Sequence, residues 1–325
     1  MKAEPPLWGL DAAMPTIAAL DLGSNTFRLM LAETASDGRA AGDAQWENRR
    51  IFQHIPRLSE RLTSGGPFAP EALKRAWAAL DGFDGHIRAA GAGTVLAGAT
   101  MAARLAANGP EFISAVSKRY GWDAAILTGA EEAQLTAVGA LTGLEPLPEH
   151  SLIFDIGGRS TEFISARQRE IAAARSLGLG VVALTEDHLR APASPGEMEA
   201  VAAEVRRILA GADFSDVSPE AVLVGTAGTV TTVAALLLGL REYRPELVNN
   251  ARLAASDMAE LLAVLARETV GERVRKHGLH PLRADAIVAG LVEILEIMKS
   301  FGRSDLLVSD NGLLEGLWLR ASGTL

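Results

Sequence analysis

The sequence feature that most constrains this chain is a short hairpin motif that occurs twice. Residues 17–33 read IAALDLGSNTFRLMLAE, in which an apolar run ends in Asp21, a polar turn follows, and a second apolar run begins. Residues 152–166, LIFDIGGRSTEFISA, repeat this order around Asp155. Glycine and small polar residues in such turns let backbone N–H groups point at a bound anion. One such hairpin is also typical of an ordinary polar turn, but two predict a duplicated fold whose phosphate-type loops face each other across a cleft.

A third glycine-rich turn follows in residues 222–233, VLVGTAGTVTTV. This pattern predicts a strand, a loop and then a helix whose N-terminus is available to an anion. Asp21 and Asp155 stand where their strands end, beside the expected phosphate loops. A carboxylate in that position is useful when a divalent cation lies between it and the phosphate.

Composition sets the size and excludes several classes of protein. The chain has 325 residues, 48% of them hydrophobic, which predicts about two domains with sizeable cores. A net charge of −9 argues against nucleic acid as a partner, although cations gathered in one cleft can still bind a phosphate chain. The absence of cysteine excludes thiolate catalysis and fits the cytoplasm. From the acidic and proline residues near the start we expect no signal peptide, and no apolar run is long enough for a membrane span.

Strands alternate with helices along the chain, and a strand–turn–strand unit opens each half. This order predicts an α/β fold with two domains and mixed sheets. The Pro-containing connector 143–150 is the expected boundary. We therefore predict a first domain over 1–142 and a second over 143–309, with a C-terminal helix at about 310–325 that packs back on the first. Residues 1–15 are expected to be a loose leader, and 34–45 a polar loop.

Two cationic stretches have both an ordinary and a functional interpretation. Residues 46–62 carry Arg49, Arg50, Arg57 and Arg61, and most such runs are solvated edge strands. Residues 273–283, RVRKHGLHPLR, are the densest cationic stretch, expected to be a solvated loop unless they line the cleft. Arg104, on a helix otherwise built from small apolar residues, is either a surface residue or an anion ligand.

Paired glutamates, Glu131 and Glu132, stand at the start of a helix expected from Gly129. The helix dipole alone favours acidic residues in a first turn. A carboxylate near a phosphate cleft can also act as a general base. The sequence leaves both interpretations open.

Together these motifs resemble the Ppx/GppA family of exopolyphosphatases and guanosine pentaphosphatases, within the superfamily of actin, sugar kinases and heat-shock chaperones. The matching stretches, in order, are ALDLGSNTFRL, PRLSERL, ATMAARLAANGPEF, LTGAEEAQL, LIFDIGGRSTEFI, SLGLG, VGTAGTV, LRADAIVAG and VSDNGLLEG. The resemblance covers about residues 16–320. It implies two actin-like (ribonuclease H-like) domains that face a central cleft.

The resemblance also implies roles for particular residues. Glu132 matches the catalytic base that activates water. Mg²⁺ would be held around Asp155 and Glu162 with Asp21 nearby, and a monovalent cation such as K⁺ is a second candidate ion. The implied phosphate-binding residues are Ser24, Asn25, Thr26, Arg57, Arg104, Gly157, Gly158, Ser160 and Thr161. Phosphoanhydride hydrolysis needs charge neutralisation and a positioned water, which these groups would supply.

Three departures from the family pattern bear on the substrate: Arg159, Gln134 and Leu314 replace a glycine and two arginines that are usual there. The favoured function is release of terminal phosphate from inorganic polyphosphate, with guanosine penta- or tetraphosphate as a close alternative substrate. A sugar or acetate kinase and a non-catalytic regulator that binds these anions are the other candidates. Apolar C-terminal helices with Trp318 favour a homodimer.

Overall fold

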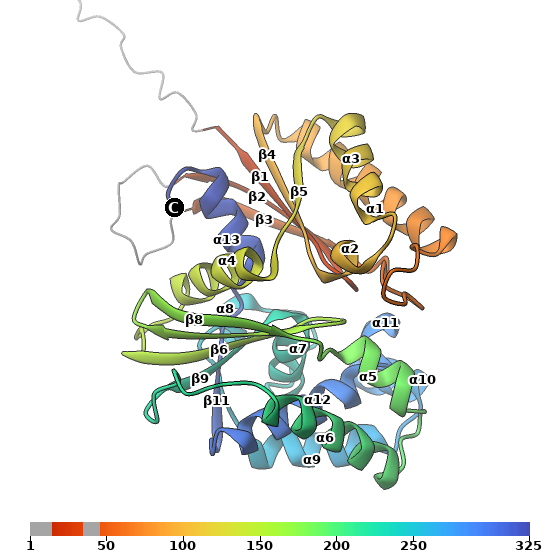
Figure 1. Cartoon of the computed structure of the whole chain (residues 1–325), viewed down its shortest axis with the longest axis vertical. Helices are drawn as coiled ribbons and strands as arrows, with labels where there is room; N and C mark the ends of the chain where they lie inside the picture. Colours follow the sequence, from red (N-terminus) through yellow and green to blue (C-terminus); the bar gives the residue numbers. More distant parts are fainter. Residues whose placement is uncertain (1–14, 35–45) are drawn as a thin grey trace, which may run out of the picture.

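The computed structural model describes residues 15–34 and 46–325, which form two mixed β-sheets with their helices (Figure 1). The leader and the polar loop expected from the sequence fall almost entirely outside these residues. The α/β architecture with two mixed sheets is confirmed. Among the described residues, no helix combines the length and the apolar character needed to cross a bilayer.

The first sheet contains the first predicted hairpin at its centre. Its strand order is β3-β2-β1-β4-β5, with β1 antiparallel to β2 and parallel to β4. The strands are β1 (Ile17–Leu22), β2 (Phe27–Thr34), β3 (Trp46–His54), β4 (Thr94–Ala99) and β5 (Asp123–Ile126). Helices α1 (Pro70–Ala89), α2 (Met101–Leu105) and α3 (Gly109–Tyr120) belong to the same half. As expected, β3 is an edge strand.

The second sheet repeats this arrangement. Its order is β10-β11-β9-β6-β7-β8, and β6 is antiparallel to β7 and parallel to β9, as β1 is to β2 and β4. The strands are β6 (His150–Ile156), β7 (Thr161–Arg167), β8 (Glu170–Leu177), β9 (Val222–Thr226), β10 (Arg252–Ala254) and β11 (Asp305–Val308). The duplication predicted from the two hairpins is therefore a duplication of strand topology.

Most of the remaining helices pack on the second sheet. They are α5 (Val181–His188), α6 (Pro195–Ala210), α7 (Ala227–Leu237), α8 (Pro245–Val248), α9 (Ala255–Ala266), α10 (Val270–His277), α11 (Pro281–Ala284) and α12 (Ile287–Ser300). Figure 1 shows α6, α9 and α12 on the face of this sheet that is turned away from the first sheet. Their apolar side chains form one large core with β6, β7 and β9.

The basic stretch 273–283 is helical rather than a solvated loop, because α10 and α11 occupy most of it. Arg273 is buried and donates to two backbone carbonyls, while Lys276 and His277 both contact Glu268. These cations stabilise the second domain. The condition on which this stretch would favour a long polyanion, that it lines the cleft, is met by Arg283 alone of this group.

Helices α4 (Gly129–Thr142) and α13 (Leu313–Ala321) lie between the two sheets (Figure 1). The apolar face of α13 packs on β1 and β2, whereas α4 also packs on the second sheet. Trp318 is fully buried in this layer, edge-on to Trp46. It therefore offers no surface for the expected homodimer, which stays a prediction, as does the domain division at 142/143.

Two glycines allow α4 and α13 to cross closely. A Cβ atom on Gly316 would lie 2.0 Å from the backbone oxygen of Leu135, and one on Gly139 would lie 1.9 Å from that of Gly312. Both neighbours are backbone atoms, which side-chain rotation cannot move away. The helices can approach this closely only because neither position carries a side chain.

We expect Gly316→Ala to lower the free energy of unfolding by about 2 kcal/mol. The overpacking cost of about 3 kcal/mol exceeds the gain of about 1 kcal/mol that alanine brings to a helix. The matched control is Gly85→Ala in α1, where a Cβ would meet no atom within 4 Å, so that substitution should be stabilising. Urea unfolding measures both, and equal stability of the two variants would contradict the close crossing.

Candidate active site

A cavity of about 690 Å³ opens between the two sheets, at the end where both hairpins turn. The β1–β2 turn lines it from one side and the β6–β7 turn from the other. A Cβ atom built on Gly158 would lie 3.4 Å from the Cβ atoms of Ser24 and Asn25. The two loops therefore face each other directly. The start of α7, which includes Gly228, closes a third side.

Most of the residues singled out in the sequence line this cavity. They are Asp21, Ser24, Asn25, Thr26, Glu132, Asp155, Gly157, Gly158, Ser160 and Glu162. Three of the expected phosphate ligands, Arg57, Arg104 and Thr161, are not among the lining residues. Arg104 donates a hydrogen bond to Glu132, which lines the cavity. Arg57 binds Asp285 at the junction of the two domains, and Thr161 is buried in the core.

The paired glutamates at the start of α4 have separate roles. Glu131 accepts hydrogen bonds from the backbone N–H of Thr128 at 2.9 Å and from its hydroxyl at 2.8 Å, and these bonds hold its pKa below the usual value. It forms a capping box with Thr128. Glu132 is instead buried in the cavity wall. Glu131 therefore stabilises the start of the helix, and Glu132 is the glutamate whose position is compatible with catalysis.

Glu132 is held by Arg104 and lies in a strongly acidic environment. Arg104 Nη1 donates to Glu132 Oε2 at 2.6 Å and to the Leu127 carbonyl at 2.7 Å. Burial, and then the negative charge of Glu162, nevertheless raise the pKa of Glu132 well above its usual value. A carboxylate with a raised pKa is a stronger proton acceptor, which suits a general base.

The expected metal ligands form an acidic group with little compensating charge. Burial, followed by repulsion from Glu162, raises the pKa of Asp155 to about 7, and burial raises the pKa of Glu162 and Asp21. Asp21 is paired with Arg28 at 3.0 Å, and Ser176 donates to Glu162 at 2.6 Å. Asp155 accepts no hydrogen bond from any described residue.

This donor set fits a divalent cation that shares its coordination with the substrate. Asp155 offers carboxylate oxygens without a protein donor, and the surrounding negative charge favours a cation. Within 15–34 and 46–325, no three acidic or histidine side chains form a complete metal cluster. Mg²⁺ is commonly held by one or two carboxylates together with waters and phosphate oxygens, so these residues fit it in that mode.

Three cavity-lining arginines were not predicted as site residues: Arg28, Arg49 and Arg283. Arg28 lies directly opposite Asp21 in the β1–β2 pairing, a register that the hairpin motif implies. Arg283 donates to Thr232 and Gln53, each at 2.8 Å. These cations offset part of the acidic charge and provide partners for phosphate.

Arg49 corrects the prediction that the charged edge strand is simply solvated. Most side chains of β3 are exposed, but Arg49 donates to Asn311 at 3.1 Å and forms an ion pair with Glu315. Glu315 comes from α13, far away in the sequence. No local pattern distinguishes Arg49 from its exposed neighbour Arg50.

The loop after β3 and the second phosphate loop are linked across the domain junction. Arg57 forms an ion pair with Asp285 at 2.8 Å, which joins the first half of the chain to the second. Arg159 Nη2 donates to the Ser59 carbonyl at 3.0 Å and to Glu186 at 2.8 Å. Arg159 therefore turns away from the cavity and binds the neighbouring loop.

The other two departures from the family pattern are also outside the cavity. Gln134 is exposed on α4, and Leu314 is buried in the apolar layer of α13. None of the three residues lines the cavity.

Two opposed glycine loops, a buried carboxylate and an acidic cluster among arginines are the groups expected of a two-domain enzyme that acts on phosphate compounds. The chain belongs to the Ppx/GppA phosphatase family, whose model matches residues 51–324. The family predicted from the motifs is therefore confirmed.

Similar proteins cover nearly the whole chain. Exopolyphosphatase 2 of Mycobacterium tuberculosis is 31% identical over 323 residues, which are 96% of this chain and 100% of that protein. A bifunctional 3-dehydroquinate synthase/phosphatase of Fusobacterium nucleatum is also similar, being 26% identical over 92% of this chain and 45% of its own length.

Solved structures agree on the fold. An exopolyphosphatase of Cytophaga hutchinsonii superimposes with a TM-score of 0.84 at 25% identity, covering 95% of this chain and 98% of that one. A Ppx/GppA family member of Aquifex aeolicus gives a TM-score of 0.77 at 25% identity, with 95% and 97% covered. The α/β fold with two mixed sheets is therefore shared with solved members of the Ppx/GppA family.

Proposed function

We propose that this protein is an exopolyphosphatase that removes the terminal phosphate from inorganic polyphosphate, with Mg²⁺ as its metal and Glu132 as the base that activates water. The observation that carries this proposal is the position of Glu132, buried in the cavity wall with a raised pKa, in a cavity whose other walls are two opposed phosphate-type loops. The family membership and the name of the Mycobacterium relative support the same substrate.

The loops supply groups that suit a phosphate chain. Among the described residues, the backbone N–H groups of Ser24, Asn25 and Gly158 have no protein acceptor, so they are free to bind phosphate oxygens. Arg28 and Arg283 add positive charge in the same cavity. Preorganised donors of this kind stabilise the charge that develops in phosphoryl transfer without further reorganisation.

Proton transfer is assigned to one side chain. Glu132 would accept the proton of the attacking water, while Arg104 fixes its carboxylate through the 2.6 Å hydrogen bond. Mg²⁺ bound at Asp155 and Glu162 would neutralise phosphate charge. No covalent enzyme intermediate is required, because phosphoryl transfer depends mainly on positioning and electrostatics.

Guanosine pentaphosphate is the second candidate substrate. The cavity lining also includes Tyr243, Pro245, Ile287 and Val181, apolar or aromatic residues of the kind that contact a nucleoside. A non-catalytic regulator is less well supported, because the three departures that motivated it lie outside the cavity. The cytoplasmic location stays a prediction.

The test is phosphate release by the purified protein with Mg²⁺, with long-chain polyphosphate and guanosine pentaphosphate offered in parallel at equal phosphate concentration. We expect a higher kcat/KM on polyphosphate and no release when Mg²⁺ is chelated. Faster release from guanosine pentaphosphate would replace the proposed substrate. Tight binding of either compound without any release would favour the regulator.

A further inference from the structure

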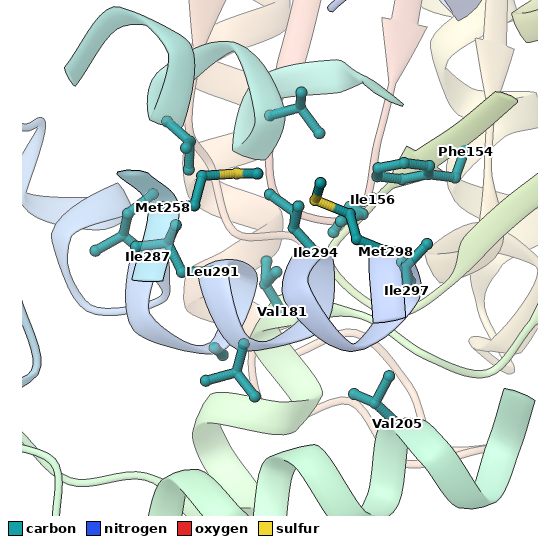
Figure 2. Packing of buried hydrophobic residues seen from close by; sticks show 14 of the residues in the cluster. Phe154, Ile156, Val181, Val205, Met258, Ile287, Leu291, Ile294, Ile297 and Met298 are labelled. Carbon is teal, nitrogen blue, oxygen red and sulfur yellow. The ribbon is translucent and has the colours of Figure 1, made fainter. Parts of the chain in front are cut away.

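A second glutamate, Glu293, is buried behind the active site rather than in it. It lies in the middle of α12 and has 0% of its surface exposed. Figure 2 shows the apolar side chains around this helix, among them Leu291 and Ile294 from α12 itself and Val181 from α5. Burying a charged carboxylate in such surroundings is costly unless it is paired.

The contacts of the Thr161 hydroxyl indicate which protonation state of Glu293 is stable in these surroundings. The Thr161 hydroxyl oxygen lies 2.6 Å from Glu293 Oε1 and 2.8 Å from the Leu179 carbonyl oxygen. Both are hydrogen-bond distances, but a hydroxyl carries only one proton and a carbonyl carries none. If Thr161 donates to Leu179, whose carbonyl has no other donor among the described residues, the second proton has to come from Glu293.

The rest of the surroundings of Glu293 also favour the neutral acid. Its Oε2 atom has no hydrogen-bond partner within the described part of the chain. No cation there contacts it, and the charge that faces it is Glu162 from β7. On the same helix, Glu296 is paired with Arg206 of α6, so that cation is already engaged. Burial raises the pKa of Glu293 to about 8; the hydrogen bond with Thr161 acts in the opposite direction, and repulsion from Glu162 adds to the rise.

This chain of hydrogen bonds holds the second phosphate loop. Thr161 directly follows Ser160, which lines the cavity. Beyond Leu179, the N–H groups of Val181 and Val182 donate to the carbonyls of Gly157 and Gly158 at 3.1 and 2.9 Å. The Glu293–Thr161–Leu179 contacts therefore fix the position of the loop from behind.

We propose that Glu293 is a positioning residue which, as a neutral carboxylic acid, donates its proton to Thr161 and so holds the phosphate loop 157–160 in its binding position. The enzymatic part of this proposal rests on the proposed function. Loss of the proton breaks the chain, because the Thr161 hydroxyl then has to donate to Glu293 and leaves Leu179 without a donor.

The stability of the fold provides a test that needs no substrate. The carboxyl of Glu293 has a pKa of about 8 in the folded chain against a usual value of 4.5, so the folded state binds more protons between these two values. Stability from this group is therefore lost as the pH rises through that range. Glu293→Gln has no such proton, and its melting temperature should fall less than that of the wild type over the same range.

Infrared spectroscopy observes the proton directly. At neutral pH, the difference spectrum of wild type minus Glu293→Gln should contain the carbonyl stretch of a protonated carboxylic acid, and this band should disappear in alkaline buffer. Subtracting the variant removes the bands of other buried acids, such as Asp155. An absent band at neutral pH would overturn the proposal, whether or not the protein hydrolyses polyphosphate.

Turnover of polyphosphate separates positioning from simple packing. We expect the KM of the wild type to rise about 5- to 10-fold in alkaline buffer, the size of effect of one lost hydrogen bond, with little change in kcat. Glu293→Gln, whose amide can still donate to Thr161, should keep a low KM at both pH values. Glu293→Met, which fills the space without a donor, should have the raised KM at both.

Two results would contradict this role. An alkaline rise of KM in Glu293→Gln equal to that of the wild type would show that another group titrates. A Glu293→Met variant that is folded and has the KM of the wild type would show that the hydrogen bond does not hold the loop. If no variant releases phosphate, the proposed function fails, and the infrared and melting experiments still decide the state of Glu293.

Discussion

Glu132→Gln is expected to lower kcat by about 10²- to 10⁴-fold, the usual contribution of a general base. Glutamine keeps the shape and accepts the hydrogen bond from Arg104, but it cannot take a proton from water. Binding of polyphosphate should be unchanged or tighter, because one negative charge leaves the cavity. Stopped-flow or steady-state phosphate release measures kcat, and calorimetry with Mg²⁺ and polyphosphate measures binding.

The same substitution should not destabilise the fold. Burial raises the pKa of Glu132, which means that the charged form is disfavoured where it stands. A neutral glutamine avoids that cost, so the melting temperature should stay the same or rise. Substitution of a catalytic residue often raises the stability of the fold while it lowers activity, because such residues are placed for the reaction and not for stability.

Glu131→Gln is the matched control, one residue away in the same helix. Because glutamine can still close the capping box with Thr128, only the charge at the helix N-terminus is lost, which should cost about 0.5 kcal/mol of stability and leave kcat within about twofold. If both variants lose activity equally, the effect belongs to the helix start and not to a base. If Glu132→Gln is as active as the wild type, the base lies elsewhere in the cavity.

Asp155→Asn is expected to have the second large effect. A cation that neutralises phosphate charge is worth several kcal/mol in the transition state, so kcat/KM should fall by about two decades or more. The Mg²⁺ concentration needed for half-maximal activity should also rise, because asparagine offers a neutral ligand. A titration of activity against Mg²⁺ at saturating polyphosphate separates these two changes.

Asp310→Asn provides a control from the same cavity. The Asp310 carboxylate also lines the cavity, and burial raises its pKa to about 6, but its partner is the Tyr243 hydroxyl. We expect the Mg²⁺ dependence of this variant to match the wild type. If Asp155→Asn leaves that dependence unchanged while Asp310→Asn shifts it, the cation is held at Asp310 and not at Asp155.

The hairpins, the helix starts and the order of the elements could be predicted because local chemistry sets them. Apolar runs that end in Asp21 and Asp155 before glycine turns specify strand–turn–strand units wherever they occur. Thr128 and Ser194 each begin a helix through a capping box that is written within a few residues of sequence. The two sheets repeat the same topology, in which the first strand of each hairpin also pairs with a parallel strand, β4 or β9.

The basic stretch 273–283 shows where local interpretation fails. Its composition suggests a solvated loop, but burial of Arg273 and the pairing of Lys276 with Glu268 depend on helices packed from other parts of the chain. Trp318 gives the same lesson, since an apolar residue near the C-terminus can be buried within the protomer or at a dimer interface. The composition of a segment shows whether it has apolar side chains to bury, but it does not show which other segment packs on them.

The sequence by itself determined the fold class, the two phosphate loops and the presence of a carboxylate pair at the start of α4. Only the tertiary structure decided which carboxylate enters the cavity, which arginines accompany it, and that Arg57 and Arg159 join the two domains. The reason is physical. Backbone conformation responds to neighbours within a few residues, whereas the partner, burial and charge of a side chain depend on segments that approach only after the chain has folded.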